Sequence, residues 1–459
     1  MKKDKAPRPG SKKKAKPASD RPSAVEVPTM QHRARRLPSR LIPDHSAEWR
    51  SEADRRIERL RKGDLVVEVR GRDGTPVKNV RVEYRLARHA FLFGTAIAYA
   101  PFADAGESGR HYRQFIVDHF SALVCENEMK WYANEVERGR EDYTAADALL
   151  AFAEQNGLAM RGHCLFWDAQ QWIQPWLDAL DQNALRAAME RRLAASVSRY
   201  AGRLVSWDVN NEMLDGPYYR KRLGPDIDAW MFREAARLDP KTPLFVNEYG
   251  ILGVPERVER CLALIRDLRA RGAQVGGIGI QSHDCDRLTV DGVMTLAPGD
   301  RPWYLYTSPL TPAAFLATLD RLHAETGLPI HLTEISAKFP DAARRGELLE
   351  MLFRLGFSHE VVEAIMLWGF SAKTHWMGPD AALTNADGTL NPAGARISRL
   401  LREEWTTQGT ATTGADGCIV FRGFYGRYEL KVETPDGRKI AQEVSLTKSA
   451  PAAVGEPRG

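Results

Sequence analysis

LVSWDVNNE, residues 204–212, is an apolar run with the character of a buried strand, and it ends in polar residues. LPIHLTEIS, residues 328–336, has the same pattern of an apolar run that ends in polar residues. Between such runs lie amphipathic segments with apolar residues at helical spacing, and two of them, 183–202 and 255–272, end at a glycine. Strands that alternate with helices in this way predict parallel β-α-β units.

The alternation of strand and helix repeats from about residue 85 to residue 404. The predicted strands span residues 91–98, 121–128, 158–167, 204–212, 243–250, 276–283, 328–336 and 364–371. A count of eight favours a closed (β/α)8 barrel over an open doubly wound sheet. No glycine-rich dinucleotide turn opens the first helix, which further disfavours the doubly wound sheet. The sequence therefore predicts the α/β class and a (β/α)8 TIM barrel over residues 85–404.

Polar side chains gather at the carboxyl ends of the predicted strands. They are Glu126, Asn127, His163, Asn211, Glu212, Asn247, Gln281, His283, Glu334 and, with an aromatic ring, Trp368. A local hydrogen bond at a strand end would explain any one of them, but the pattern recurs around the predicted barrel. The carboxyl-terminal end of such a barrel is where active sites are built.

Two of these residues, Glu212 and Glu334, are carboxylates at the ends of apolar strands. A carboxylate in that place is costly to desolvate, so it usually has a function or a partner. A single one would most simply be a helix cap or an ion-pair partner. A pair favours the two-carboxylate chemistry of glycoside hydrolysis. No His, Asp or Glu group has the spacing of a metal site, and we expect neither a metal nor a cofactor.

Two segments that flank the predicted barrel have a different pattern. Residues 64–90 alternate around a DG turn, and residues 405–447 contain further hairpin-like stretches. We expect the two segments to pair into one small β-module.

The charge of the chain is unevenly placed. Residues 1–36 contain 12 Lys or Arg and 3 Asp or Glu, whereas the whole chain has a net charge of +5, so the remainder is acidic. This Lys-, Pro- and Ser-rich segment has too few apolar residues to form a core, and we predict a disordered basic tail over residues 1–40. A solubilising leader or a mis-assigned start is favoured over binding to nucleic acid or an anionic surface.

The sequence shows no targeting signal and no cysteine pattern that points to a function. No apolar segment follows the basic start as in a secretory signal, and no run approaches the length of a membrane span. The five cysteines are odd in number and match no zinc or redox spacing, so a disulfide has no positive support. We expect a monomer that binds neither nucleic acid nor a membrane, and localisation stays open.

The motifs of the barrel region resemble glycoside hydrolase family 10, the endo-β-1,4-xylanase family. They follow in order as FGTAIA (93–98), ENEMKW (126–131), RGHCLFWD (161–168), WDVNNEML (207–214), VNEYG (246–250), GIGIQSH (277–283), LTEI (332–335) and LWGFSAKTHW (367–376). One such motif is weak, but eight in order are very specific. ENEMKWY, RGHCLFWD and RGFYGRYEL look most like the branch found in plants and their bacterial relatives.

The resemblance implies a retaining endo-β-1,4-xylanase that hydrolyses internal linkages of xylan by double displacement. Glu334 corresponds to the nucleophile and Glu212 to the acid/base, and retention requires the two carboxyl groups to lie roughly 5 Å apart. Glu212 then needs the higher pKa, which we expect the nearby charge of Glu334 to supply.

The resemblance also implies a set of substrate-binding residues. Asn211 corresponds to the group that hydrogen-bonds the 2-hydroxyl of the reacting sugar. Glu126, Asn127 and Lys130 correspond to the group that binds the next sugar on the non-reducing side. His163 and Trp167 surround the reacting sugar, Gln281 and His283 lie beside the nucleophile, and Trp368 and Trp376 are aromatic platforms. Tyr249 borders the leaving-group side. The partner implied is xylan or a related β-1,4-linked polysaccharide.

Three positions depart from the family pattern. Ser336 stands where the family usually has an Asp two residues after the nucleophile, Asp168 stands where many xylanases have a His, and the loop after Trp368 differs. Two alternatives to the hydrolase stay open: a carbohydrate-binding protein on a decayed hydrolase barrel, and a transglycosylase that uses the same site.

Overall fold

The computed structural model describes residues 46–448, except for 72, 253, 284, 286–287, 289–309, 434–436 and 438. The tail predicted over residues 1–40 lies outside the described residues. Within the described part, no helix is long and apolar enough to cross a membrane.

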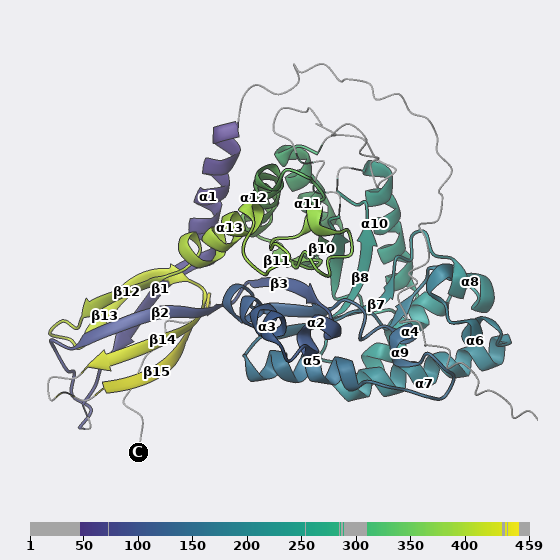
Figure 1. The fold of residues 1–459 in the computed structure, drawn as a ribbon, viewed down its shortest axis with the longest axis horizontal. Coiled ribbons are helices and arrows are strands. Elements are labelled where there is room, and N and C mark those ends of the chain that lie inside the picture. Colours follow the sequence, from purple (N-terminus) through teal and green to yellow (C-terminus); the bar gives the residue numbers. More distant parts are fainter. Residues whose placement is uncertain are drawn as a thin grey trace, which may run out of the picture. The chain divides into compact units, whose positions relative to one another are not determined.

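Eight parallel strand positions close into a barrel (Figure 1). The strands are β3 (Leu92–Ile97), β4 (Ala122–Cys125), β5 (Ala159–Gly162), β7 (Ser206–Asn211), β8 (Leu244–Tyr249), β9 (Gly277–Gln281), β10 (Ile330–Ile335) and β11 (Val362–Leu367). Pairing of β11 with β3 and of β5 with β7 closes the ring. The predicted fold class is confirmed.

The third predicted strand is interrupted, which the sequence did not indicate. β5 ends at Gly162, and a two-residue strand, β6 (Phe166–Trp167), follows and pairs with the end of β7. Between these two strands, the Leu165 N–H donates to the Asp208 carbonyl of β7 at 3.0 Å. This detour places Trp167 beside the end of β7.

Helices follow the barrel strands in sequence. The longer ones are α3 (Glu107–His119), α5 (Thr144–Gln155), α7 (Gln182–Tyr200), α9 (Ile227–Leu238), α10 (Pro255–Ala270), α11 (Pro312–Thr326), α12 (Ala342–Ser358) and α13 (Pro392–Arg399). Short elements lie in the loops: α2 (Tyr99–Ala103), α4 (Trp131–Asn134), α6 (Pro175–Asp178), α8 (Tyr218–Leu223), η1 (Gln170–Trp172), η3 (Pro379–Ala381) and η4 (Leu400–Glu404).

Local sequence signals explain several helix ends. The side chain of Asp181 caps α7 by accepting from Ala184 N–H, and Thr311 caps α11 in the same way with Pro312 at the first helical position. α11 ends at Gly327, whose φ of 69° suits glycine.

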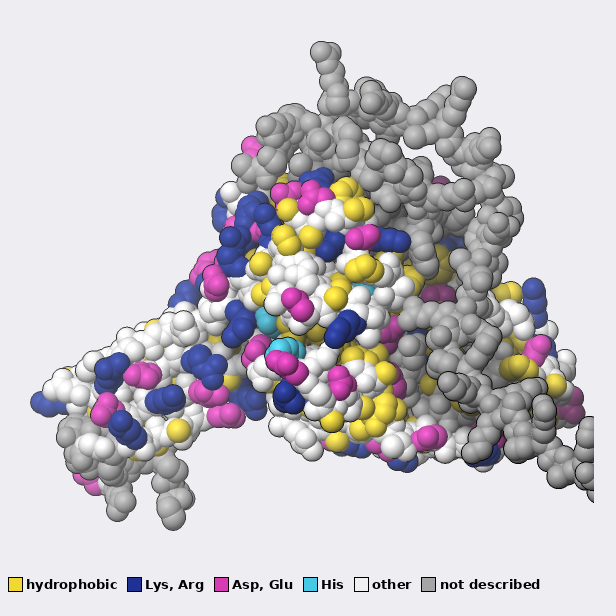
Figure 2. All heavy atoms as spheres, viewed as in Figure 1, with side chains coloured by type: hydrophobic (Ala, Val, Ile, Leu, Met, Phe, Trp, Pro, Cys, Tyr) yellow, Lys and Arg dark blue, Asp and Glu magenta, His cyan; other side chains and the backbone are white. Residues whose placement is uncertain are grey.

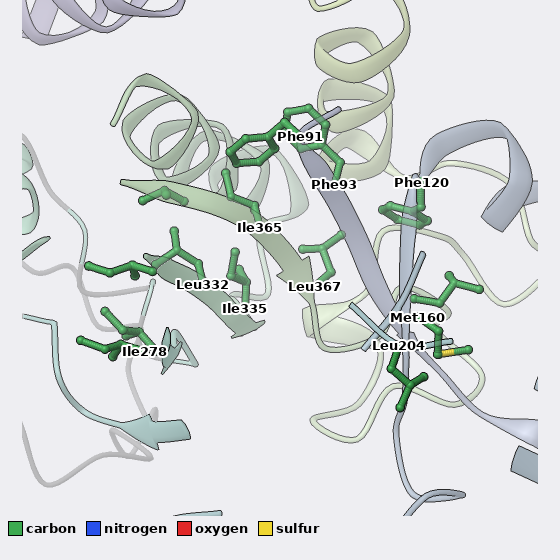
Figure 3. Packing of buried hydrophobic residues seen from close by; sticks show 14 of the residues in the cluster. Phe91, Phe93, Phe120, Met160, Leu204, Ile278, Leu332, Ile335, Ile365 and Leu367 are labelled. Atoms are coloured by element: carbon green, nitrogen blue, oxygen red, sulfur yellow. The ribbon is translucent and has the colours of Figure 1, made fainter. Parts of the chain in front are cut away.

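The hydrophobic core joins strand and helix side chains (Figure 3). Phe93 on β3 lies 4.9 Å from Phe357 of α12 and 5.4 Å from Trp405, measured between ring centroids. Leu332 and Ile365 on neighbouring strands are fully buried. Such burial contributes about 1.5–3 kcal/mol per large side chain, so the barrel is a rigid support for its loops.

A helix that the sequence analysis did not predict precedes the barrel. α1 (Ser46–Arg61) packs against α12, where Arg354 pairs with Asp54 at 2.7 Å. Arg61 donates to the carbonyls of Phe357 and Val362, both at 2.8 Å. The Phe357 carbonyl lies in the last turn of α12, where carbonyl groups have no hydrogen-bond partner within the helix.

The segments on either side of the barrel in sequence pair with each other. β1 (Lys62–Glu68) pairs with β13 (Cys418–Phe424), and β2 (Arg81–His89) lies between β12 (Gln408–Thr412) and β14 (Gly426–Glu433). β15 (Lys439–Leu446) completes the second sheet. Between the sheets, the rings of Tyr84 and Phe421 stack at 3.7 Å. These strands form the predicted small flanking β-module.

The exposed surface of the β-module mixes charges of both signs, with few hydrophobic side chains on the face shown in Figure 2. Cross-strand pairs such as Arg85 with Glu429, at 2.7 Å, account for part of this pattern.

Candidate active site

Both predicted catalytic glutamates lie next to irregularities in their strands. On β7, Asp208 pairs with Phe245 and Asn211 with Asn247, so β7 has one residue more than its partner just before Glu212. On β10, the same irregularity between Leu332 and Ile335 contains Glu334. A β-bulge re-aims side chains and is frequent beside active sites.

The backbone of Glu212 is itself unusual. Its φ is 61°, in the left-handed region, and among the described non-glycine residues only Asn79 shares this feature. For a non-glycine residue this conformation costs about 1–2 kcal/mol. Such strain persists where surrounding structure fixes it and is concentrated at functional sites.

Asparagine and glutamine amides connect the two carboxylates. Asn247 Nδ2 donates to Glu334 Oε1 at 2.7 Å and to Asn211 Oδ1 at 2.8 Å. Gln281 Nε2 lies 3.3 Å from both Asn211 Oδ1 and Glu212 Oε1. Because the Asn211 oxygen is occupied, its Nδ2 amine is the group left to donate to a bound molecule.

Glu334 is surrounded by hydrogen-bond donors and lies within the field of the Lys130 ammonium group. His283 Nε2 lies 3.1 Å from Oε2, and His163 Nε2 lies 3.9 Å from Oε1. Burial opposes ionisation of this carboxyl, but the His283 hydrogen bond and the electrostatic potential of the surrounding groups, Lys130 among them, outweigh it and lower the pKa of Glu334 to about 2. Glu334 is therefore ionised at neutral pH.

Glu212 titrates in the opposite direction. Burial is the largest cause that raises the pKa of Glu212, and the negative charge of Glu334 raises it further. Hydrogen bonds from Trp167, whose Nε1 lies 2.9 Å from Oε2, and from Gln281 partly oppose that rise. The charge of Glu334, which we expected to be the cause, raises the pKa of Glu212 less than desolvation does.

His163 is oriented by a buried ion pair. Its Nδ1 lies 2.9 Å from Asp208 Oδ2, which leaves Nε2 facing Glu334. Asp208 in turn accepts from Arg161, which also donates to Ser206 at 2.9 Å. Such a partner fixes the tautomer and ring orientation of a histidine.

Aromatic rings and Lys130 form a second part of the site. Lys130 Nζ lies 4.6 Å from the Trp167 ring and 5.7 Å from the Trp368 ring. Trp368 meets His163 edge to face at 5.0 Å, and Trp376 meets His283 in the same manner at 4.9 Å. Trp368 is only 6% exposed, so it lies in the floor of the site and not on an open surface.

The loop after β4 contributes the remaining predicted residues. Asn127 Oδ1 accepts from the Tyr132 hydroxyl at 2.6 Å and lies 3.5 Å from Lys130 Nζ. Glu126 follows β4 directly, and its charge acts on Lys130. The structure thus brings all predicted site residues to the carboxyl ends of the barrel strands. The contacts above join them into one cluster, with Glu126 joined through its charge.

Several residues of this cluster were not predicted as site residues. Asn247 is predicted only as a strand-end residue, and Arg161 and Asp208 fall within the predicted strands 158–167 and 204–212 without a predicted site role. Trp172 stacks on Trp167 at 5.0 Å, and Tyr132 stacks on Trp172 at 5.3 Å. Tyr132 closes the ENEMKWY motif and Trp172 lies four residues after RGHCLFWD, but neither position predicts the stack.

The leaving-group side predicted at Tyr249 has its own polar support. Arg257 lies over the Tyr249 ring at 4.2 Å and pairs with Asp215 at 2.7 Å. Asp215 lies three residues after Glu212 in the sequence. Its carboxylate accepts a hydrogen bond from the Tyr249 side chain. The ring of Tyr249 is therefore held in place beside the acid/base candidate.

The departures from the family pattern have specific surroundings. Asp168 accepts from Tyr219 N–H at 3.0 Å, and burial raises its pKa to about 7. Ser336 Oγ lies 3.1 Å from His283 Nδ1 and 3.2 Å from Trp376 Nε1. In the described part of the chain, no group of three or more His, Cys, Asp or Glu residues could hold a metal ion.

Comparisons with known proteins agree on a family. A sequence model of Glycosyl hydrolase family 10 matches residues 84–398. The chain is 37% identical over 413 residues to the anti-sigma-I factor RsgI6 of Acetivibrio thermocellus, covering 89% of this chain and 50% of that protein. It is 33% identical over 397 residues to endo-1,4-beta-xylanase 1 of Arabidopsis thaliana, covering 86% of this chain and 39% of that protein. The chain therefore spans half or less of the length of these curated relatives.

Solved structures give the same result. Xylanase 10B from Thermotoga petrophila, in complex with xylobiose, matches with a TM-score of 0.58 and 25% identity over 69% of this chain and 95% of that chain. Native xylanase 10B from Thermotoga maritima matches with the same TM-score of 0.58 and 25% identity, over 69% of this chain and 96% of that chain. The resemblance derived from the motifs is confirmed. Since the family model covers more than half of the sequence, the chain belongs to Glycosyl hydrolase family 10.

Proposed function

We propose that the protein is a retaining endo-β-1,4-xylanase, with Glu334 as nucleophile and Glu212 as acid/base. The observation that carries the proposal is the opposite titration of two connected carboxyl groups. The pKa of Glu334 is lowered to about 2, whereas the pKa of Glu212 is raised. Two carboxyl groups with pKa values pushed apart are the pattern of an acid and a nucleophile. Membership of family 10 and the names of the plant relatives support the substrate class.

In the first step, a carboxylate oxygen of Glu334 attacks the anomeric carbon and the bond to the leaving-group oxygen breaks. Glu212 gives its proton to that oxygen, so the leaving sugar departs as a neutral alcohol. The product is a covalent glycosyl ester of Glu334. His283 and Asn247, which donate to the two Glu334 oxygens, keep the carboxylate in place for the attack.

In the second step, a water molecule attacks the anomeric carbon from the side that the leaving group vacated. Glu212, now a carboxylate, takes a proton from this water, and the ester bond to Glu334 breaks. Both groups return to their starting states, and the configuration at the anomeric carbon is retained. The hydrogen bonds from Trp167 and Gln281 stabilise Glu212 while it is ionised.

The surrounding residues suit a flat, hydroxyl-rich polymer. The free amine of Asn211 would bind the 2-hydroxyl of the reacting sugar, beside His163 and Trp167. Glu126, Asn127 and Lys130 would bind the next sugar on the non-reducing side, with Trp376 as a platform. We propose xylan as the polysaccharide partner and a monomer as the active form.

The test uses an aryl β-xylobioside and the Glu334→Ala variant. Wild type should hydrolyse the substrate, and the variant should lose hydrolysis while its circular dichroism is unchanged. Azide should restore part of the cleavage of the aryl substrate with inverted configuration, because it fills the vacated space. Glu363→Ala is the matched control, since Glu363 on β11 is 60% exposed, and this variant should retain full activity.

The alternatives give different outcomes in the same experiment. A carbohydrate-binding protein would bind xylan without turnover in the wild type. A transglycosylase would release the aryl group at a normal rate but transfer most glycosyl groups to added xylo-oligosaccharides. Near-wild-type activity in Glu334→Ala would mean that another residue is the nucleophile.

A further inference from the structure

Ser336 lies at one end of a short hydrogen-bonded chain that ends on Glu334. Its hydroxyl oxygen is 3.1 Å from His283 Nδ1, and the other ring nitrogen of His283 is 3.1 Å from Glu334 Oε2. The same hydroxyl oxygen is 3.2 Å from Trp376 Nε1. Ser336 is 2% exposed, so water does not compete freely for these bonds.

The direction of each bond follows from what the groups can donate. An indole N–H only donates, so Ser336 accepts from Trp376. The Glu334 carboxylate is ionised and only accepts, so His283 Nε2 must have the proton. Two states satisfy both conditions: a neutral ring whose Nδ1 accepts the Ser336 hydroxyl proton, and an imidazolium whose Nδ1 donates to Ser336.

The hydroxyl proton decides between the two states. In the neutral state, it is donated to His283 Nδ1, and every group has a partner. In the imidazolium state, the hydroxyl would accept from both His283 and Trp376, and its own proton would need another acceptor. Among the described residues, the hydrogen bonds of this hydroxyl go only to His283 and Trp376. A buried donor without a partner is disfavoured.

We propose that Ser336 is a positioning residue that holds His283 as a neutral imidazole with its proton on Nε2. Trp376 occupies a lone pair of the hydroxyl oxygen and so turns the hydroxyl proton toward Nδ1. The nucleophile then receives a neutral hydrogen bond from His283 and not an ion pair. This inference rests on the proposed function only where it concerns catalysis, because the proton arrangement itself belongs to the resting protein.

Other charged and titratable groups lie around the pair. From the described residues they are Glu334 on β10, His163 after β5, Lys130 after β4, Glu212 after β7 and His375 after β11. Burial lowers the pKa of His375 to about 3, so it adds no positive charge at neutral pH. Ser336 is the group that contacts His283 Nδ1 directly, so the direction of that hydrogen bond depends on its hydroxyl proton.

Histidine nitrogen NMR of the whole chain tests the proton arrangement without any turnover. The protein is labelled with 15N-histidine, and the His283 signals are identified by their loss in His283→Asn. In the wild type near neutral pH, we expect one protonated and one unprotonated ring nitrogen, with the proton on Nε2. In Ser336→Asp, both nitrogens should be protonated, because a carboxylate can only accept from Nδ1.

Two further variants guard against a fold defect in Ser336→Asp. Ser336→Thr keeps the hydroxyl and should keep the wild-type pattern, whereas Ser336→Ala should shift the Nδ1 signal because its donor is lost. Ser282→Ala is the matched control: it removes a buried hydroxyl next to His283 that bonds Ile280 O at 3.4 Å, and it should leave the pattern unchanged.

An imidazolium in the wild type at neutral pH, or a neutral ring with its proton on Nδ1, would overturn the inference. So would an Nδ1 signal that is the same in Ser336→Ala as in the wild type. Xylan turnover is measured separately. Absence of turnover with the expected NMR pattern would reject the proposed function alone, and turnover with an imidazolium would reject the role of Ser336 alone.

Discussion

Replacement of Asn247 by alanine should destabilise the ionised form of Glu334 relative to its protonated form. Asn247 Nδ2 donates to the buried Glu334 carboxylate at 2.7 Å. A hydrogen bond to a charged group contributes about 1.5–3 kcal/mol, and each pKa unit corresponds to about 1.4 kcal/mol, so the pKa of Glu334 should rise by about one to two units. The acid limb of the kcat/KM profile should move to higher pH by that amount.

The same change should destabilise the protein in a pH-dependent way. The pKa of Glu334 is lowered in the folded state, so its ionisation stabilises the fold above its unfolded pKa, and this is lost as pH falls toward about 2. Asn247→Ala should therefore reduce the free energy of unfolding by about 1.5–3 kcal/mol more at neutral pH than where Glu334 is protonated. The variant also removes the Asn247 oxygen that accepts a hydrogen bond from the Thr333 hydroxyl at 2.6 Å. This loss should lower the free energy of unfolding at all pH values.

Urea unfolding at several pH values and initial rates on an aryl β-xylobioside measure both effects. Asn385→Ala is the control, because Asn385 is an exposed loop residue whose amine bonds Thr389 at 3.0 Å. An unmoved acid limb, together with a destabilisation that is equal at all pH values, would refute the role of Asn247 in stabilising the carboxylate.

Three further variants test other parts of the account. Glu212→Ala should slow substrates with poor leaving groups by roughly 10²- to 10⁴-fold but aryl glycosides far less, since only poor leaving groups need a proton; equal losses in steady-state rates would mean that Glu212 is not the acid. Deletion of residues 1–36 should leave Tm and xylan turnover nearly unchanged, because the segment lacks a core-forming pattern; a Tm lower by several degrees would contradict this. Ser336→Asp should move the acid limb of kcat/KM to lower pH with equal or higher activity, because an imidazolium favours ionised Glu334; an upward shift with reduced activity would show that the new charge acts on Glu334 first.

Much of the fold was predictable because the barrel strands are buried on both sides. Each predicted strand is a short apolar run, and apolar residues such as Leu332 and Ile365 are indeed fully buried. The first helix was predictable in principle as well, since Trp49, Ala53 and Ile57 recur at a spacing of four residues and pack on the core. Charged residues occupy most of the other positions of this segment, and they obscure the helical pattern.

The proposed catalytic pair, Glu212 and Glu334, could be predicted from motifs, but the contacts that connect the two residues required the structure. Both β7 and β10 contain an extra residue beside the two glutamates, and register shifts of this kind leave no local sequence signal. The split between β5 and β6, where the Leu165 N–H bonds to the neighbouring strand β7, is likewise not revealed by any run of residues. The stack of Tyr132 on Trp172 likewise joins two loops that lie apart in the sequence.

Trapping of the covalent intermediate tests the central claim most directly. A 2-deoxy-2-fluoro-β-xylobioside with a dinitrophenyl leaving group should glycosylate the wild type, because fluorine slows both steps while the good leaving group preserves the first. Intact mass should rise by one glycosyl unit, and peptide mass spectrometry should place the label on Glu334, with no label in Glu334→Ala. A label on any other residue, or hydrolysis of the activated glycoside with inversion and no covalent adduct, would contradict the account.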